Sequence, residues 1–169
     1  MKRILVIAFF FLAKTGLAQT PYTSTVDERK VTILNGIVTK YALENNAAFN
    51  LWYGPNQTSY KPDMAVLNAM EAAKGKIQFV VFGGTWCEDT QFILPKFFKL
   101  QELSGVPDNS ISFFGVDRKK KTLGNLADAF KITNVPTIII MKDGKETGRL
   151  VEYGKTGKWD TELGELLGK

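Results

Sequence analysis

The apolar positions of the chain follow two different periods, which are clearest after residue 61. Short apolar runs, typical of buried strands, are separated by segments whose apolar positions recur every three or four residues, as on one face of a helix. The runs predict strands over 77–82, 110–116, 135–141 and 149–153, and the helical period predicts helices over 62–73, 88–103, 123–130 and 158–167. Because helices separate the first strands and Asp143-Gly144 forms a tight hairpin turn, we expect an α/β domain with a mixed central sheet flanked by helices.

The pattern is less regular before residue 62. Apolar positions recur at helical spacing from residue 31 to residue 43, which predicts an amphipathic helix interrupted by Gly36. Residues 19–30 are polar and predict a flexible segment. Aromatic side chains gather between residues 49 and 60, and we interpret this stretch as a loop packed onto the main body; a lip that faces a substrate is the alternative. Residues 19–61 are therefore expected to form a helical and aromatic extension in front of a domain at 62–169.

The first 18 residues have the composition of a secretory signal peptide. Lys2-Arg3 precede an apolar stretch over 4–13, and Gly16-Leu17-Ala18 places small residues at a cleavage site. The apolar stretch is too short to span a bilayer stably. We therefore expect cleavage near Ala18, a periplasmic or secreted protein, and no stable membrane insertion after cleavage. An N-terminal anchor helix that stays attached is the alternative.

Composition narrows the possible functions. The net charge of the whole chain is +5, but residues 1–18 carry three of the 22 basic residues and none of the 17 acidic ones. The remainder is close to neutral, so no nucleic-acid partner is implied, and we interpret the basic run at 118–121 as a solvated loop. The chain has no histidine and one cysteine, which excludes a Ser–His–Asp triad, a Cys–His dyad, histidine and thiolate metal sites, and an intramolecular disulfide. We expect no metal and no cofactor.

The one cysteine, Cys87, stands where a thiol can be reactive. It follows an apolar strand and Gly83-Gly84, at the predicted first turn of a helix. The partial positive charge and free N–H groups at a helix N-terminus favour thiolate over thiol. A small buried hydrophobe kept for packing is the alternative. Because exported compartments oxidise exposed thiols, an unpaired cysteine there either is buried or reacts with a group outside the chain.

The order of elements and two motifs resemble the thioredoxin family over residues 62–168. Trp86-Cys87 matches the start of the family's W-C-x-x-C site, and Val135-Pro136-Thr137 matches the segment around its cis proline. Lys142-Asp143-Gly144-Lys145 and Gly154 match the family's hairpin turn and a glycine after its last strand. The resemblance implies the thioredoxin fold, with Pro136 in cis and facing Cys87 across the site.

Three positions depart from the family's pattern. Thr90 stands in place of the second cysteine, and the family's buried acid and its partner lysine fall on Val81 and near Phe113, which are apolar. In dithiol enzymes the acid is thought to help move protons when the second cysteine attacks, so its loss is consistent with a dismantled second half-reaction. The W-C-E-D-T version, with an aromatic N-terminal extension, resembles an exported thioredoxin-like group of Gram-negative bacteria.

A single thiolate can attack a disulfide and form a mixed disulfide, and only release of that adduct needs a second thiol. We therefore expect a monothiol thiol–disulfide oxidoreductase or isomerase that acts, as a monomer, on thiols or disulfides of other proteins. A thiol of the substrate or a small-molecule thiol would release the adduct. Cys87 is the expected nucleophile, and Thr90 is expected to donate a hydrogen bond to its sulfur.

A peptide groove is expected beside the thiol. Trp86 and Pro136 would form its walls, while Val135 and Thr137 would expose backbone groups that pair with an extended peptide. This groove motivates the alternative function, a redox-silent module that binds peptides or proteins after losing turnover.

Overall fold

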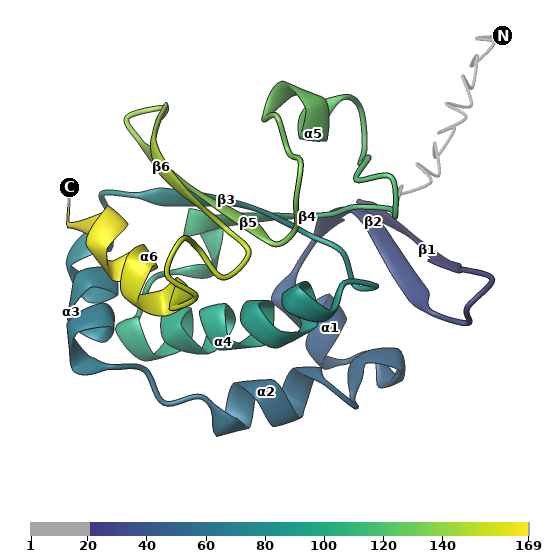
Figure 1. Ribbon diagram of the computed structural model, residues 1–169, viewed down its shortest axis with the longest axis horizontal. Coiled ribbons are helices and arrows are strands. Elements are labelled where there is room, and N and C mark those ends of the chain that lie inside the picture. The colour runs from purple at the N-terminus through teal and green to yellow at the C-terminus, as the bar shows by residue number, and fades with distance from the viewer. Residues whose placement is uncertain (1–20, 169) are drawn as a thin grey trace, which may run out of the picture.

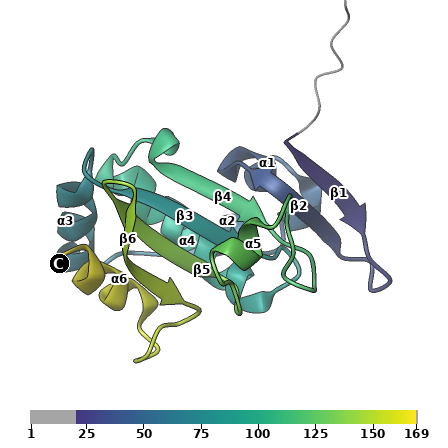
Figure 2. The ribbon, with the colours of Figure 1, turned by 90° about the horizontal axis from the view of Figure 1, so that it is seen from above.

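A computed structural model of the chain describes residues 21–168, and the predicted signal peptide lies outside the described residues. A six-stranded sheet runs through the molecule in the order β1-β2-β4-β3-β5-β6 (Figures 1 and 2). The strands are β1 (Tyr22–Val26), β2 (Thr32–Val38), β3 (Gln78–Gly83), β4 (Ile111–Gly115), β5 (Thr137–Lys142) and β6 (Lys145–Val151). The helices are α1 (Lys40–Glu44), α2 (Tyr53–Ser59), α3 (Met64–Ala73), α4 (Glu88–Ser104), α5 (Leu126–Ala129) and α6 (Trp159–Leu167), with short 3-10 turns at Ala47–Phe49 and Asp108–Ser110.

The predicted mixed sheet is confirmed. Strands β3 and β4 are parallel and connected through α4, whereas the other neighbouring pairs in the sheet are antiparallel. Strand β3 lies in the interior of the sheet, between β4 and β5. Figure 1 shows α5 on one side of the sheet and the longer helices α3, α4 and α6 on the other.

Alternating side chains of the central strands build two apolar layers, one on each face of the sheet. Phe79 and Val81 of β3 belong to the larger layer, which includes buried residues of α4. Phe82 belongs to the smaller layer, together with Ala127 of α5. Because both faces are covered, β3 reads as an almost continuous apolar run. The loop after β3 carries Cys87, and it therefore begins at a strand that is buried in the core.

The apolar core continues across residue 62. Buried side chains from the N-terminal extension belong to the same layer as those of α4, namely Leu34, Val38, Leu43, Phe49 and Tyr53. The aromatic stretch at 49–60 thus packs onto the main body, as expected. The expectation of a loop there is wrong for Tyr53–Ser59, which is helix α2 and packs against α4.

The predicted helix over residues 31–43 is wrong. Thr32–Val38 form strand β2, and only Lys40–Glu44 are helical in this stretch. The segment is rich in β-branched residues, which favour a strand, and Gly36 has a φ of 124°, which no helix contains. Strand β2 is stabilised by antiparallel pairing with β4, about 75 residues later in the chain, which local periodicity does not reveal.

Strand β2 lies unusually close to β4 at Gly115. A Cβ atom on residue 115 would collide with the carbonyl oxygen of Leu34, so the strands can meet here only because this residue has no side chain. Gly115 pairs with Gly36 in the register of the two strands. The attachment of the N-terminal extension to the sheet therefore depends on a glycine of the thioredoxin-like region.

The predicted flexible segment over 19–30 is wrong for Tyr22–Val26, which form strand β1 at the edge of the sheet. This strand pairs with β2 from Tyr22↔Gly36 to Val26↔Thr32, and four of its five side chains are exposed. A strand held by backbone hydrogen bonds rather than by burial carries little apolar signal, which is why the pattern missed it. The predicted helix over 123–130 is reduced to the four residues of α5.

Candidate redox site at the start of α4

Cys87 is the residue that precedes the first turn of α4. Its backbone is extended, with φ −97° and ψ 125°, and its N–H donates to the carbonyl of Gly84 over 2.9 Å. Its own carbonyl accepts the N–H of Gln91, also over 2.9 Å. Cys87 is partly exposed and lies at the positive end of a 17-residue helix.

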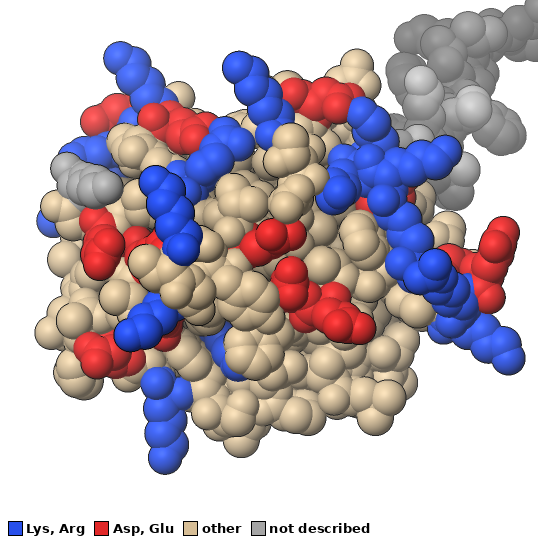
Figure 3. All heavy atoms as spheres, in the orientation of Figure 1, with Lys and Arg blue, Asp and Glu red and all other residues tan. Residues whose placement is uncertain are grey.

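Acidic side chains surround the start of the helix. Glu88 and Asp89 occupy the first turn of α4, where carboxylates stabilise the helix N-terminus. Figure 3 shows a group of acidic side chains at the place where α4 begins in Figure 1. Tyr153, in the loop after β6, completes this side of the site. Burial raises the pKa of its phenol, and the nearby Asp89 carboxylate raises it further.

The thiol faces the segment of the cis proline. The Val135–Pro136 peptide bond is cis, as the family resemblance implies. The Cys87 Sγ donates a hydrogen bond to the Val135 carbonyl over 3.2 Å. Residues 48 positions apart in the chain are thus brought together.

Three of the four residues expected to bind a peptide lie in the segment of the cis proline, and they differ in what they leave free. Pro136 is buried, and its carbonyl already accepts the N–H of Glu152 over 2.8 Å. Thr137 is 1% exposed, lies between β3 and β6 in the sheet, and donates its hydroxyl to the carbonyl of Asn134 over 2.7 Å. Val135 is also buried, at 2% exposed, so no side chain of the segment is available on the surface, and Val135 meets the thiol through its carbonyl.

Thr90 makes a different contact from the expected one. It is fully buried, and its hydroxyl oxygen accepts the backbone N–H of Gly84 over 3.2 Å. Among residues 21–168 no hydrogen bond joins Thr90 to Cys87. A Cβ atom on Gly83 would lie 2.9 Å from the Thr90 methyl and 3.1 Å from the Phe113 ring, so Thr90 fills the space under the loop together with that ring.

The positions of the family's buried acid and lysine are apolar in three dimensions as well. Val81 and Phe113 are register partners on β3 and β4, and they are 0% and 2% exposed. Neither of these two side chains can donate or accept a proton.

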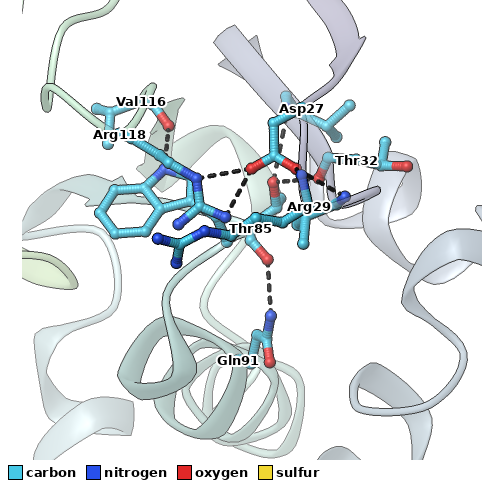
Figure 4. Close-up of polar contacts among 10 residues, drawn as sticks. Asp27, Arg29, Thr32, Thr85, Gln91, Val116 and Arg118 are labelled. Atoms are coloured by element: carbon cyan, nitrogen blue, oxygen red, sulfur yellow. Dashed lines mark hydrogen bonds and ion pairs between the residues drawn. The ribbon is translucent and has the colours of Figure 1, made fainter.

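Trp86 is held from two sides (Figure 4). Its indole Nε1–H donates to the carbonyl of Val116 over 2.9 Å, and the guanidinium carbon Cζ of Arg118 lies over the ring, 5.4 Å from the ring centroid. That guanidinium is paired with Asp27, in the turn between β1 and β2, through Nε at 2.7 Å and Nη2 at 2.6 Å. Sequence reasoning missed both charged residues, because it treated 118–121 as a solvated loop and did not predict the hairpin that carries Asp27.

Thr85 ties the same loop to strand β2. Its hydroxyl donates to the Thr32 carbonyl over 2.8 Å and accepts the Leu34 N–H over 3.3 Å, while its carbonyl accepts from the Gln91 side chain over 2.8 Å. Figure 4 shows these contacts beside the Asp27–Arg118 pair. The N-terminal extension therefore borders the residues that immediately precede Cys87.

A mainly apolar cavity of about 170 Å³ lies elsewhere, between β2, α1, α4 and β4. Its one lysine, Lys40, is 8% exposed and already pairs with Gln101, Glu102 and Asp108, so it offers no free donor to a ligand. None of the predicted site residues lines this cavity. Within residues 21–168 no group of three or more metal-ligating side chains gathers, and no helix is both long and apolar enough to cross a membrane.

Comparisons with known proteins agree with this geometry. The thioredoxin family model matches residues 65–161. A thioredoxin of Coprinus comatus is 36% identical over 82 residues, which cover 48% of this chain and 74% of that protein. A thioredoxin of Staphylococcus haemolyticus is 28% identical over 86 residues, covering 51% and 78%.

The fold is also found in a solved structure of low sequence similarity. A protein of unknown function from Pseudomonas aeruginosa superimposes with a TM-score of 0.56 at 16% identity, over 78% of this chain and 90% of that one. With the parallel β3–α4–β4 unit, the thiol at the start of α4 and the cis proline opposite it, these matches lead to one conclusion: the chain belongs to the thioredoxin family.

Proposed function

We propose that the protein is an exported thiol–disulfide oxidoreductase or isomerase that works by a monothiol mechanism through Cys87. The observation that carries the proposal is the placement of the only cysteine of the chain. Cys87 is partly exposed, and its Sγ lies at the N-terminus of α4, against the carbonyl that precedes a cis proline. Membership of the thioredoxin family supports disulfide chemistry at this position.

The reaction needs no group beyond thiols and a disulfide. The Cys87 thiolate attacks one sulfur of a partner disulfide, a new S–S bond forms, and the other sulfur leaves as a thiolate that takes up a proton. A second thiol then attacks the mixed disulfide and returns Cys87 as a thiolate. If this thiol belongs to the partner, its disulfides are rearranged with no net oxidation. If two small-molecule thiols supply the electrons, the partner disulfide is reduced and they are oxidised to a disulfide.

The neighbours of the sulfur have distinct parts in this proposal. Once Cys87 loses its proton, the Val135 carbonyl has lost its donor and can accept a backbone N–H of an extended partner peptide. Trp86, which is partly exposed, flanks that peptide, and the buried Pro136 lies next to the Val135 carbonyl. Thr90 supports the thiol indirectly, because its hydroxyl oxygen holds the N–H of Gly84 in the loop that leads to Cys87.

The proposed location is the periplasm or the exterior of the cell, with the protein acting as a monomer. It rests on residues 1–18, whose composition is that of a cleaved signal peptide. Expression of the full chain in a Gram-negative host should release a protein whose intact mass equals that of residues 19–169. A mass that still includes residues 1–18 would contradict the proposed export.

The first test measures capture of a disulfide by the folded protein at pH 7. The probe is a peptide closed by one disulfide, and the adduct is detected by intact mass under acid quench. We expect wild-type protein to form a one-to-one mixed disulfide and Cys87→Ser to form none. Iodoacetamide labelling of folded protein provides the accessibility control. Labelling of Cys87 only after denaturation, with no adduct, would remove the thiol from the proposed mechanism.

The alternative is a redox-silent module that binds peptides. The apolar pair Val81 and Phe113 favours it, since the proton-transfer groups of the dithiol enzymes are absent. Binding measurements with a physiological partner distinguish the two proposed functions. Unchanged affinity of Cys87→Ser for the partner, without any covalent adduct in the wild type, would support the binding module.

A further inference from the structure

The hairpin formed by β1, β2 and their turn (residues 22–38) contacts the redox loop at two points. Thr85 is bonded to the backbone of β2, and Trp86 is reached through Arg118 and Asp27 (Figure 4). Both contacts are made to the two residues directly before Cys87. The hairpin is therefore placed to influence the thiol's surroundings without touching the sulfur.

Asp27 is held in place by hydrogen bonds within its own turn, and it anchors the contact of Arg118 with Trp86. One of its carboxylate oxygens accepts the backbone N–H groups of Arg29 and Val31, each over 2.9 Å. The other accepts Nε and Nη2 of Arg118. The carboxylate is thus held by its own turn, and a planar guanidinium paired in this way loses little further freedom when it meets an aromatic ring.

Arg118, fixed by Asp27, restricts the orientation of the Trp86 indole. The indole is held at its edge by the Val116 carbonyl and at its face by the guanidinium. Without Asp27, the arginine would be a flexible side chain in a basic run of four. Partly exposed ion pairs contribute little to global stability, so the main effect of this pair falls on the orientation of Trp86.

We infer that Asp27 and Arg118 are positioning residues for Trp86, and that through them the N-terminal hairpin shapes the wall against which a partner peptide docks beside Cys87. This inference rests on the proposed function of Cys87. It assigns to the extension a part in partner recognition rather than in the reaction of the sulfur.

The test compares three variants that break the contact with one matched control. Asp27→Asn and Arg118→Met remove the ion pair, and Arg118→Lys keeps the charge but not the two-point geometry. The control is Asp128→Asn, which breaks the exposed Lys121–Asp128 pair of the same basic run, with side chains 55% and 56% exposed. Two rates are measured for each protein: labelling by iodoacetamide, which needs no groove, and capture of the disulfide peptide, which does.

We expect Asp27→Asn and Arg118→Met to slow peptide capture about two- to fivefold, as for loss of an exposed cation–π contact. The rate of iodoacetamide labelling should change less than the rate of peptide capture. Arg118→Lys should capture peptide faster than Arg118→Met but more slowly than the wild type. Asp128→Asn should capture peptide at the wild-type rate. In a Trp86→Ala background, Asp27→Asn should have no further effect on capture. Acrylamide quenching, with Trp86→Phe to identify the Trp86 contribution, should show greater exposure of Trp86 in the first two variants.

The outcomes separate the inference from the function on which it rests. Equal peptide capture and equal quenching in all variants, with a reactive Cys87, would overturn the positioning role and leave the function standing. Failure of the wild type to capture any peptide would remove the function, while the quenching measurement would still decide whether Asp27 and Arg118 position Trp86. An equal loss of both rates in Asp27→Asn would indicate general disruption and would also overturn the inference.

Discussion

At the scale of single residues, Thr90 stands where the family resemblance places a second cysteine, and it contributes packing and a backbone hydrogen bond in place of a thiol. Its methyl group packs beside the Phe113 ring, and its hydroxyl oxygen accepts the N–H of Gly84. Cysteine has a single γ atom, so it could replace only one of these two groups at a time. Thr90 therefore fills the space under the loop and supplies no thiol to the site.

Thr90→Cys is accordingly expected to form a disulfide with Cys87. Residues three apart at the start of a helix lie on one face, and disulfides join Cα atoms about 4.4–6.8 Å apart. The oxidised variant should be two hydrogens lighter by intact mass, and the reduced variant should gain reduction of insulin disulfides with an external reductant. Thr90→Val, which keeps the shape without a thiol, should gain neither. A variant with two free thiols after oxidation would show that the geometry is wrong.

The residues of the site were predictable from sequence to different degrees. Trp86, Cys87 and Pro136 belong to short motifs, so their proximity followed from the family resemblance. The partner of Thr90 did not follow, because a hydroxyl can serve either the sulfur or the backbone and only the packed loop decides. Asp27 and Arg118 are 91 positions apart and meet only because an unpredicted hairpin joins the sheet.

At the scale of elements, the most informative contact is the pairing of β2 with β4. The strands β3 and β5 were predictable because burial on both faces gives continuous apolar runs. Strand β2 was not, since its spacing of apolar residues fitted a helix equally well and its partner strand lies far away in the chain. Its attachment is concentrated at the close approach of Leu34 to Gly115.

Gly115→Ala is expected to weaken this pairing. The added methyl collides with a backbone carbonyl, which can yield only if the strands separate, and overpacking of this kind costs about 1–3 kcal/mol. The free energy of unfolding in urea should fall by this amount. Gly54→Ala is the matched control: its Cβ would enter open space within helix α2, so stability should stay equal or rise by up to about 1 kcal/mol. Equal stability of the two variants would contradict the proposed importance of the close approach.

At the scale of the whole molecule, a cluster of charges joins the N-terminal extension to the rest of the fold. Lys40, at the start of α1, pairs with Glu102 at 3.2 Å and with Asp108 at 2.8 Å, and it donates to Gln101 over 3.1 Å. The Lys40 ammonium, followed by the Tyr41 hydroxyl, holds the pKa of the Asp108 carboxyl below its ordinary value of 3.8. A carboxyl whose pKa is lower in the folded state stabilises the fold above its unfolded pKa, and this contribution is lost as the pH falls through the folded value.

Lys40→Met is expected to lower the free energy of unfolding at pH 7 by about 1 kcal/mol, a modest loss because both carboxylates remain partly exposed. The difference from wild type should persist down to about pH 4 and shrink below it, as Asp108 becomes protonated in both proteins. Urea unfolding between pH 7 and pH 3 measures this difference. The exposed Lys142→Met is the control and should show no such pH dependence. If the difference in unfolding free energy between Lys40→Met and the wild type stays constant down to pH 3, Asp108 is not its source.

The pairing of β2 with β4 also bears on how the protein is made. The N-terminal hairpin leaves the ribosome before the strand on which it docks, which follows about 75 residues later. Thr85 lies more than 50 positions after its partners in the hairpin, and Arg118 lies 91 positions after Asp27. During that interval the extension has no sheet to join, and the newly made thiol is not yet bordered by it. A chain with several cysteines would risk wrong internal disulfides at this stage. This chain, with one cysteine, can make only one kind of oxidative error between its own copies, a dimer linked through Cys87. Two small-molecule thiols reduce that dimer to two free Cys87 thiols and are themselves oxidised to a disulfide.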